Sequence, residues 1–109
     1  MIFSTVIYAP FVEEIIFRKN IYDCVTAFGS NKTTKWLYVM ISGFIFAALH
    51  VSGTVKSNLD YLYIIPYLSL GITFSLLYVK SDNVFSTISI HAFHNLVAVI
   101  LYFLRGVFL

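Results

Sequence analysis

The stretch VFSTISIHAFHNLVAVILYFL, residues 84–104, decides the fold of this chain, because its 21 residues include no Asp, Glu, Lys or Arg. A helix that crosses the roughly 30 Å hydrocarbon layer of a bilayer needs about 20 mostly apolar residues. A run of this length and composition therefore predicts a membrane-spanning helix.

Two further runs of the same kind precede it, residues 36–55 and residues 61–79. The joints between the runs, residues 56–60 and 80–83, are short, and each carries one Lys and one Asp. Short joints make neighbouring helices antiparallel. Trp and Tyr lie near the ends of the runs, as in the aromatic belts of membrane interfaces. The pattern predicts an all-α multipass transmembrane bundle of about four helices.

The first stretch differs from these three, because its apolar run, residues 1–12, meets an acidic pair at positions 13 and 14. It has neither the basic start nor the small-residue cleavage site of a signal peptide. We expect one helix to continue through the acidic pair to about Phe28, with Pro10 in an early turn or at a kink. Gly29-Ser30-Asn31 supplies its stop. Since the chain starts inside apolar sequence, we expect a fragment or a shortened relative of a larger bundle.

The composition excludes several other classes of protein. Of the 109 residues, 60% are hydrophobic and 11% are charged, whereas soluble domains carry about 25% charged residues. The net charge of +2 is too small for a nucleic-acid binder. The lone Cys24 cannot form an internal disulfide. With no internal repeat or linker, we expect one domain, residues 1–109.

The loop charges predict an orientation. Residues 18–35 hold four basic side chains and one acidic one, while the two later joints are balanced. The positive-inside rule places this first segment in the cytoplasm. The joint 56–60 and Leu109 then lie outside, and the joint 80–83 lies inside.

Ionisable side chains within apolar sequence are costly and often mark a site. Glu14 and Arg18 are four residues apart, so on a helix they share a face and can pair. That pair either lets a helix end sit in the membrane interface or orders a site. Glu13 points about 100° away from Glu14 and has no basic residue at i+4. An uncompensated carboxylate of this kind is expected to be protonated or to take part in chemistry.

The other candidates are three histidines and an amide. His91 and Asn95 share a helix face, where Asn95 is either a site residue or an interhelical hydrogen-bonding group. His94 lies near that face, as a spare hydrogen-bonding residue or a substitute ligand. His50 is either a hydrogen-bonded core residue or a site residue. At about 1.5 Å per residue, the glutamates, His91 and Asn95 can share one depth, whereas His50 requires a tilted helix or one that starts deeper.

Three motifs occur in order on separate hydrophobic helices: Glu13-Glu14-x-x-x-Arg18, Phe46-x-x-x-His50 and His91-x-x-x-Asn95. This pattern resembles the CPBP family of intramembrane proteases, also called the CAAX protease or ABI family, which includes the type II CAAX prenyl endopeptidases. Ala9-Pro10 and Phe17 also resemble the family's surroundings of the first motif. One motif alone would be a weak signal, but three in order over nearly the whole chain are specific.

The resemblance implies a role for each matched residue. Glu13 would be the general base that activates water, and His50 would position or polarise that water. His91 and Asn95 would stabilise the oxyanion on the scissile carbonyl. Peptide hydrolysis needs a base for water and donors aimed at developing negative charge, so these assignments agree with the chemistry of the side chains.

Glu14 and Arg18 would form the pair that orders the site. The chain departs from the family at Lys19, which stands where Gly often follows the arginine. Family members are described both as metalloproteases and as glutamate-dependent proteases. A glutamate and two histidines could hold zinc, but the chain lacks the HExxH pattern. We therefore favour a site without a cofactor and keep zinc as the alternative.

The sequence thus predicts an intramembrane endopeptidase of a bacterial plasma membrane, since the compact form resembles bacterial members, some linked to bacteriocin self-immunity. Its partners would be the lipid bilayer and a membrane-associated peptide or protein substrate, without nucleic acid. A homo- or hetero-oligomer could complete the bundle. One alternative is a non-catalytic immunity or scaffold protein of the same fold, disfavoured because every catalytic position is filled. A transport or proton-relay subunit is the other, disfavoured because no line of polar residues spans all the helices.

Overall fold

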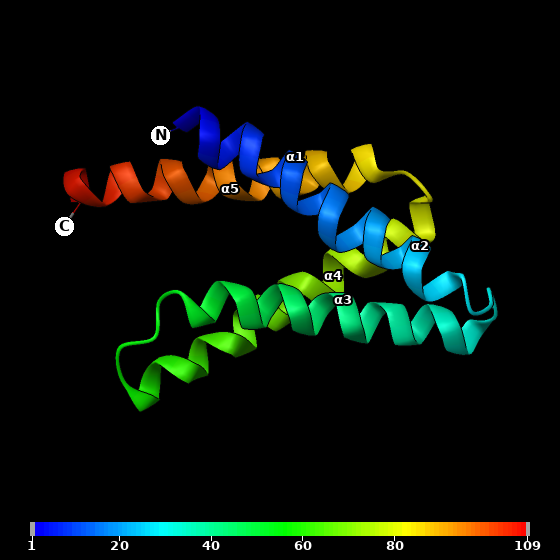
Figure 1. Cartoon of the computed structure of the whole chain (residues 1–109). Helices are drawn as coiled ribbons and strands as arrows, with labels where there is room; N and C mark the ends of the chain where they lie inside the picture. The colour runs from blue at the N-terminus through cyan, green and yellow to red at the C-terminus, as the bar shows by residue number, and fades with distance from the viewer. Residues whose placement is uncertain (1, 109) are drawn as a thin grey trace.

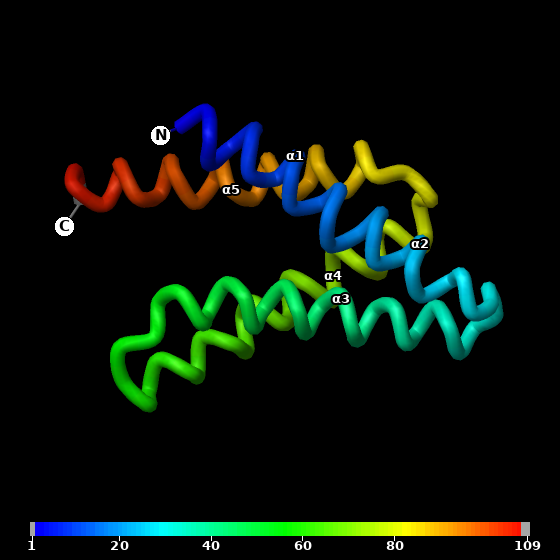
Figure 2. The backbone as a smooth tube through the Cα atoms, viewed as in Figure 1, coloured from blue at the N-terminus to red at the C-terminus, as the bar shows by residue number. Residues whose placement is uncertain are grey.

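The computed structural model describes residues 2–108, and all regular structure in that range is helical (Figure 1). The elements are η1 (Ser4–Tyr8), α1 (Ala9–Glu14), η2 (Ile15–Asn20), α2 (Ile21–Thr26), α3 (Lys32–Ser52), η3 (Asn58–Tyr63), α4 (Ile64–Ser81) and α5 (Val84–Phe108). The first four follow one another without a break, so the backbone trace forms four rods (Figure 2). The predicted all-α bundle is confirmed.

The first rod runs through the acidic pair, as expected, and is helical from residue 2 to Thr26. Two of its segments, η1 and η2, are π-helical. Pro10 is the second residue of α1, after Ala9, whose N–H bonds to Ser4 O five residues back at the end of η1. Proline has no N–H and its ring crowds the carbonyl four residues earlier. The wider π turn in front of it keeps the helix continuous.

The second rod, α3, starts earlier and ends earlier than the expected range 36–55. It starts at Lys32 because the Asn31 side chain accepts a hydrogen bond from the Thr34 N–H (2.9 Å) and caps the helix. It ends at Ser52. The apolar run and the helix differ at their starts because the run measures the length that crosses the membrane, whereas a cap sets where the helix begins.

The third and fourth rods extend the remaining runs. A 3₁₀ segment, η3, begins inside the expected joint 56–60, where Asp60 Oδ2 accepts from the Ser57 N–H (3.1 Å), and leads into α4. Asp82 adopts a left-handed conformation (φ 50°) that ends α4. The final helix, α5, begins at Val84 as expected and continues to Phe108, past the expected end at Leu104.

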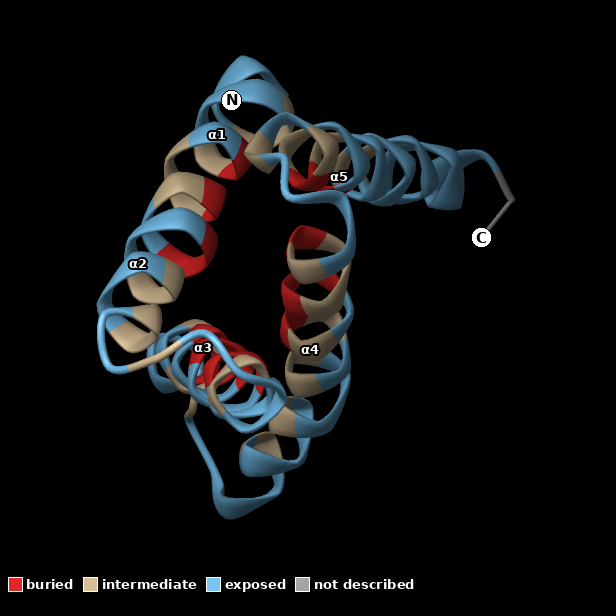
Figure 3. Ribbon diagram, turned by 90° about the vertical axis from the view of Figure 1, so that its right-hand side faces the viewer, coloured by how far each residue is buried: buried red, intermediate tan, exposed pale blue. Residues whose placement is uncertain are grey.

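Within residues 2–108, three helical segments are long and apolar enough to cross a membrane, Lys32–Ser52, Asn58–Ser81 and Val84–Val107. Their large apolar side chains are mostly exposed, especially along α5. Figure 3 shows the buried residues on the helix faces that point toward the centre of the bundle. An apolar exterior around a partly polar centre is the arrangement of a multipass membrane protein.

The α3–α4 pair forms the largest helix interface, and the two backbones meet at Gly43 and Gly71. A Cβ built on Gly71 would lie 2.8 Å from Gly43 O and 2.9 Å from Gly43 Cα. Small residues allow this kind of close approach between membrane helices. The buried Ala47 and Ser75 follow these glycines at i+4, so both helices present a small-residue face.

Replacing Gly71 with alanine is expected to destabilise the bundle by about 1–3 kcal/mol, because backbone atoms cannot move aside as a flexible side chain can. The matched control is Gly106→Ala, where a Cβ meets nothing within 4 Å. The measurement is thermal unfolding in detergent followed by far-UV circular dichroism. Equal unfolding temperatures for the two variants would show that α3 and α4 can move apart at Gly71 without loss of stability, and would contradict the prediction.

Candidate active site

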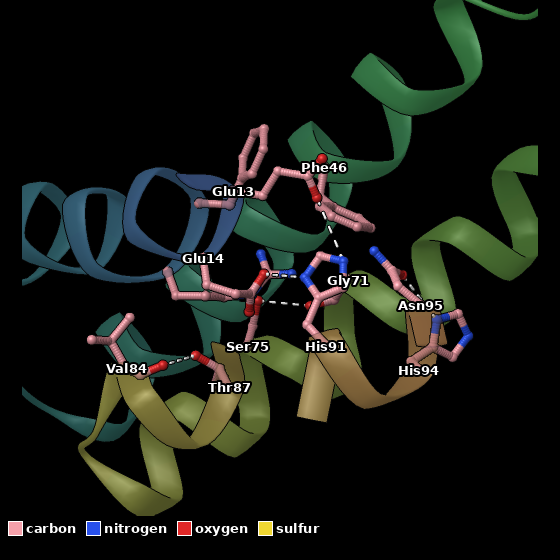
Figure 4. A network of polar contacts seen from close by, with 12 residues as sticks. Glu13, Glu14, Phe46, Gly71, Ser75, Val84, Thr87, His91, His94 and Asn95 are labelled. Atoms are coloured by element: carbon pink, nitrogen blue, oxygen red, sulfur yellow. Dashed lines mark hydrogen bonds and ion pairs between the residues drawn. The ribbon is translucent and has the colours of Figure 1, made fainter. Parts of the chain in front are cut away.

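Glu13 lies between two histidines that come from different helices. Its Oε1 is 3.4 Å from His50 Nε2 on α3, and its Oε2 is 3.5 Å from His91 Nε2 on α5. The side chains of Glu13 and His50 are each 26% exposed, whereas His91 is buried. Figure 4 shows Glu13 and Glu14 approaching His91 from α1. The structure thus brings together the carboxylate and the two imidazoles that the sequence singled out.

The partners of the two histidines decide which ring nitrogen carries the proton. His50 Nδ1 is 2.7 Å from the Phe46 carbonyl oxygen, which can only accept. His91 Nδ1 is 3.0 Å from Oε2 of Glu14, whose Oε1 is paired with Arg18. Both Nδ1 atoms therefore donate, and in a neutral imidazole each Nε2 then carries a lone pair. Two basic nitrogens face the two oxygens of Glu13.

Glu14 and Arg18 form the expected ion pair, with 3.0 Å between Glu14 Oε1 and Arg18 Nε, and neither side chain is exposed. Arg18 Nη1 also donates to Ser42 Oγ (3.0 Å). The guanidinium carbon lies 5.0 Å from the Phe46 ring centroid and 5.6 Å from that of Phe74, within the range of cation–π attraction. A carboxylate, a hydroxyl and two aromatic rings compensate the buried cation.

A pair of serines extends this network through the α3–α4 interface. Ser42 Oγ donates to the carbonyl oxygen of Phe17. Ser75 Oγ lies 3.0 Å from Ser42 Oγ and 2.8 Å from the carbonyl oxygen of Gly71. Sequence reasoning missed both serines. Ser42 is next to Gly43 and Ser75 is one turn after Gly71, each within an apolar run, and such small residues indicate an interhelical contact.

Asn95 lies near Glu13, His50 and His91, but its side chain already makes a hydrogen bond. Its Nδ2 donates to the backbone carbonyl of Thr5 (2.8 Å), which ties the start of the first rod to α5. An amide nitrogen has a second hydrogen to donate. His94 is exposed, and its Nδ1 lies 3.4 Å from Asn95 Oδ1. The contact of Asn95 matches the interhelical role that the sequence left open.

A cavity of about 240 Å³ adjoins these groups. Its wall contains Glu13, Phe46, His50, Tyr67, Leu70, His91, His94, Asn95 and Ala98. Tyr67, also missed from sequence, stacks on the His50 ring with 5.3 Å between centroids. A second, mostly apolar cavity of about 480 Å³ shares Asn95 and Ala98 with the first. Glu14 and Arg18 lie behind the wall rather than in it.

A protein metal site needs several ligating side chains around one point. Among residues 2–108, no group of three or more His, Cys, Asp and Glu side chains is disposed to hold a metal ion. Glu13, His50 and His91 come nearest, with the Glu13 oxygens 3.4 and 3.5 Å from the two Nε2 atoms. Oxygen and nitrogen ligands of a tetrahedral zinc ion lie about 3.4 Å from one another, so zinc stays the alternative to a site without a cofactor.

The fold and the site define a class: a multipass helical membrane protein whose few ionisable side chains converge on a cavity within the bundle. The family described as type II CAAX prenyl endopeptidase Rce1-like matches residues 1–97. The chain belongs to that family. This agrees with the resemblance carried by the three motifs.

One curated relative is a Bacillus subtilis (strain 168) protein named "Putative membrane peptidase YdiL". It is 31% identical over 101 residues, which cover 93% of this chain and 36% of the relative. The chain thus spans about a third of the length of that relative. No solved structure matches the chain.

Proposed function

We propose that this chain is an intramembrane endopeptidase that hydrolyses a peptide bond of a membrane-associated protein or peptide in a bacterial plasma membrane. The observation that carries the proposal is the position of Glu13, whose carboxyl group lies between two imidazole nitrogens at the wall of a cavity. Membership of a protease family and the organism of the relative support it.

In this proposal Glu13 is the general base. Its carboxylate takes one proton from a water molecule in the cavity while the water oxygen bonds to the scissile carbonyl carbon. His50 Nε2 accepts a hydrogen bond from the same water and holds it in place, since the Phe46 carbonyl fixes the ring. When the tetrahedral intermediate collapses, the C–N bond breaks and Glu13 returns the proton to the amine.

His91 stabilises the oxyanion in this scheme. Because Nδ1 already donates to Glu14, Nε2 can donate to an oxyanion only when the ring carries a second proton. The Glu14 carboxylate lies against the resulting imidazolium and also contacts Arg18, which holds both side chains in place. Asn95 adds its second amide hydrogen. Glu14 and Arg18 thus act through His91 as positioning residues.

The apolar cavity of about 480 Å³ offers a path for the substrate, because it shares Asn95 and Ala98 with the cavity at Glu13. A hydrophobic segment lying against α5 would bring its backbone to the site from within the membrane. The substrate class in this proposal is therefore a membrane-embedded or membrane-anchored chain.

The class of reaction is tested with the protein reconstituted in liposomes together with a set of synthetic single-span peptides, in water enriched in ¹⁸O. We expect mass spectrometry to find fragments with one ¹⁸O atom in the new carboxyl group. If peptides bind but none is cleaved, the protein is a non-catalytic immunity or scaffold protein and the proposal fails.

Metal removal is expected to leave the cleavage rate unchanged, because the reaction proposed here needs only protein side chains and water. The measurement compares initial rates before and after dialysis against 1,10-phenanthroline, with a known zinc peptidase as the positive control. Loss of activity that zinc restores would contradict the metal-free reaction and would assign the ion to Glu13, His50 and His91.

A further inference from the structure

A third cavity, which shares no wall residue with the other two, lies in a groove between α3 and α4. It has a volume of about 350 Å³ and lies where α3 begins and α4 ends, on the right of Figure 1. Its wall consists of Lys32, Lys35, Trp36, Val39, Leu76, Val79 and Lys80. None of these residues takes part in the contacts of Glu13, His50 and His91.

The groove combines three lysines with an apolar floor. Val39 is buried, and Leu76 and Val79 are half-buried. Among residues 2–108, no carboxylate lies within ion-pair distance of Lys32, Lys35 or Lys80. The neighbouring Lys19 is different, because it is paired with Asp23 (3.3 Å). Three uncompensated positive charges therefore surround the entrance of an apolar groove.

We propose that this groove binds one anionic phospholipid. The headgroup phosphate lies among the ammonium groups of Lys32, Lys35 and Lys80, and an acyl chain follows Val39, Leu76 and Val79 toward the centre of the membrane. Basic pockets between membrane helices on the cytoplasmic side suit anionic headgroups, and the loop charges assign this end to the cytoplasm. Trp36 is 51% exposed and lies near the start of α3, and Trp side chains favour the membrane interface.

The apolar floor of the groove indicates that the bound anion belongs to a lipid. A soluble anion could neutralise the lysines, but it would leave the floor of the groove without a partner. Each Lys near a membrane surface contributes about 1 kcal/mol of attraction to anionic lipid. Three lysines therefore predict a preference on the order of 10²-fold over a zwitterionic lipid with the same chains.

Trp36 is the chain's single tryptophan and lies in the groove, so its fluorescence reports on the occupant. The protein is placed in nanodiscs that contain, at equal mole fraction, brominated phosphatidylglycerol or brominated phosphatidylcholine. Bromine quenches a tryptophan that it contacts. We expect clearly stronger quenching by phosphatidylglycerol, and we expect added inorganic phosphate not to relieve it.

Two variants of equal net charge separate a specific site from general attraction. K32Q/K35Q/K80Q removes the three groove lysines and is expected to abolish the excess quenching. K19Q/K56Q/R105Q removes three positive charges outside the groove and is expected to retain it. Leu76→Phe is the third variant. It narrows the groove without changing the charge and adds no second tryptophan, and it should reduce the excess quenching by phosphatidylglycerol.

Equal quenching by the two lipids, equal loss in the two triple variants, or displacement by inorganic phosphate would each overturn the proposal. Far-UV circular dichroism of each variant checks that the bundle is folded. Restoration of the excess in K32R/K35R/K80R is expected, since arginine keeps the charge and binds phosphate.

Discussion

Glu13→Gln is expected to lower kcat for peptide hydrolysis by about 10²- to 10⁴-fold, the usual contribution of a general base. Glutamine keeps the shape of the side chain and one carbonyl oxygen for hydrogen bonding, but it cannot take up a proton from water. Because the substrate contacts of the cavity remain, KM should change little. The measurement is steady-state cleavage of a peptide identified in the ¹⁸O experiment.

The matched control for that variant is Asp23→Asn. Asp23 is also a carboxylate of the first rod, but it is exposed and paired with Lys19 away from the cavity. Its loss should leave kcat unchanged. If Glu13→Gln retained the wild-type kcat, another group would have to activate water and the proposed role of Glu13 would be wrong.

Arg18→Met is expected to destabilise the folded protein by about 3–5 kcal/mol, the cost of removing one partner from a buried ion pair. Methionine preserves much of the length and the contacts with Phe46 and Phe74 but leaves the Glu14 carboxylate without its cation. The measurement is the free energy of unfolding in mixed detergent micelles. Lys19→Met, which breaks the exposed pair with Asp23, should cost less than about 1 kcal/mol.

A double variant checks the cause of that loss. Glu14→Gln combined with Arg18→Met removes both charges, so it should recover a large part of the stability lost in Arg18→Met. A double variant less stable than the single one would mean that packing, rather than the unpaired carboxylate, determines the cost.

The sequence predicted those parts of the structure that depend on local spacing. The apolar runs identified the three segments able to cross a membrane, and the four-residue separation of Glu14 and Arg18 predicted their contact. The helix starts were less predictable. Lys32 and Lys35 belong to α3 because one side chain, Asn31, caps it, and hydropathy does not measure capping.

The convergence of Glu13, His50 and His91 could be expected only as feasible, because it depends on how three helices cross. The depth of each residue was estimated for straight helices normal to the membrane. On that assumption His50 does not reach the level of Glu13 unless its helix is tilted. Residue spacing alone could not place Glu13, His50 and His91 in one site, whereas the resemblance of their motifs to the protease family did. Ser42 and Ser75 escaped notice because a hydroxyl in an apolar run has no distinct pattern until a neighbouring helix places a partner beside it.

The π-helical turn at residues 15–20 makes the length of the first rod as important as its side chains. A π turn holds more residues than an α turn, so deleting one residue there would leave a regular α-helix. If the turn became a regular α turn without such a deletion, everything before it would rotate by about 100° relative to the residues beyond it. Glu13 would then turn away from His50 and His91 although every side chain of the proposed site was still present. The extra residue of the wide turn therefore aims the acidic pair at the two histidines as much as the motif itself does.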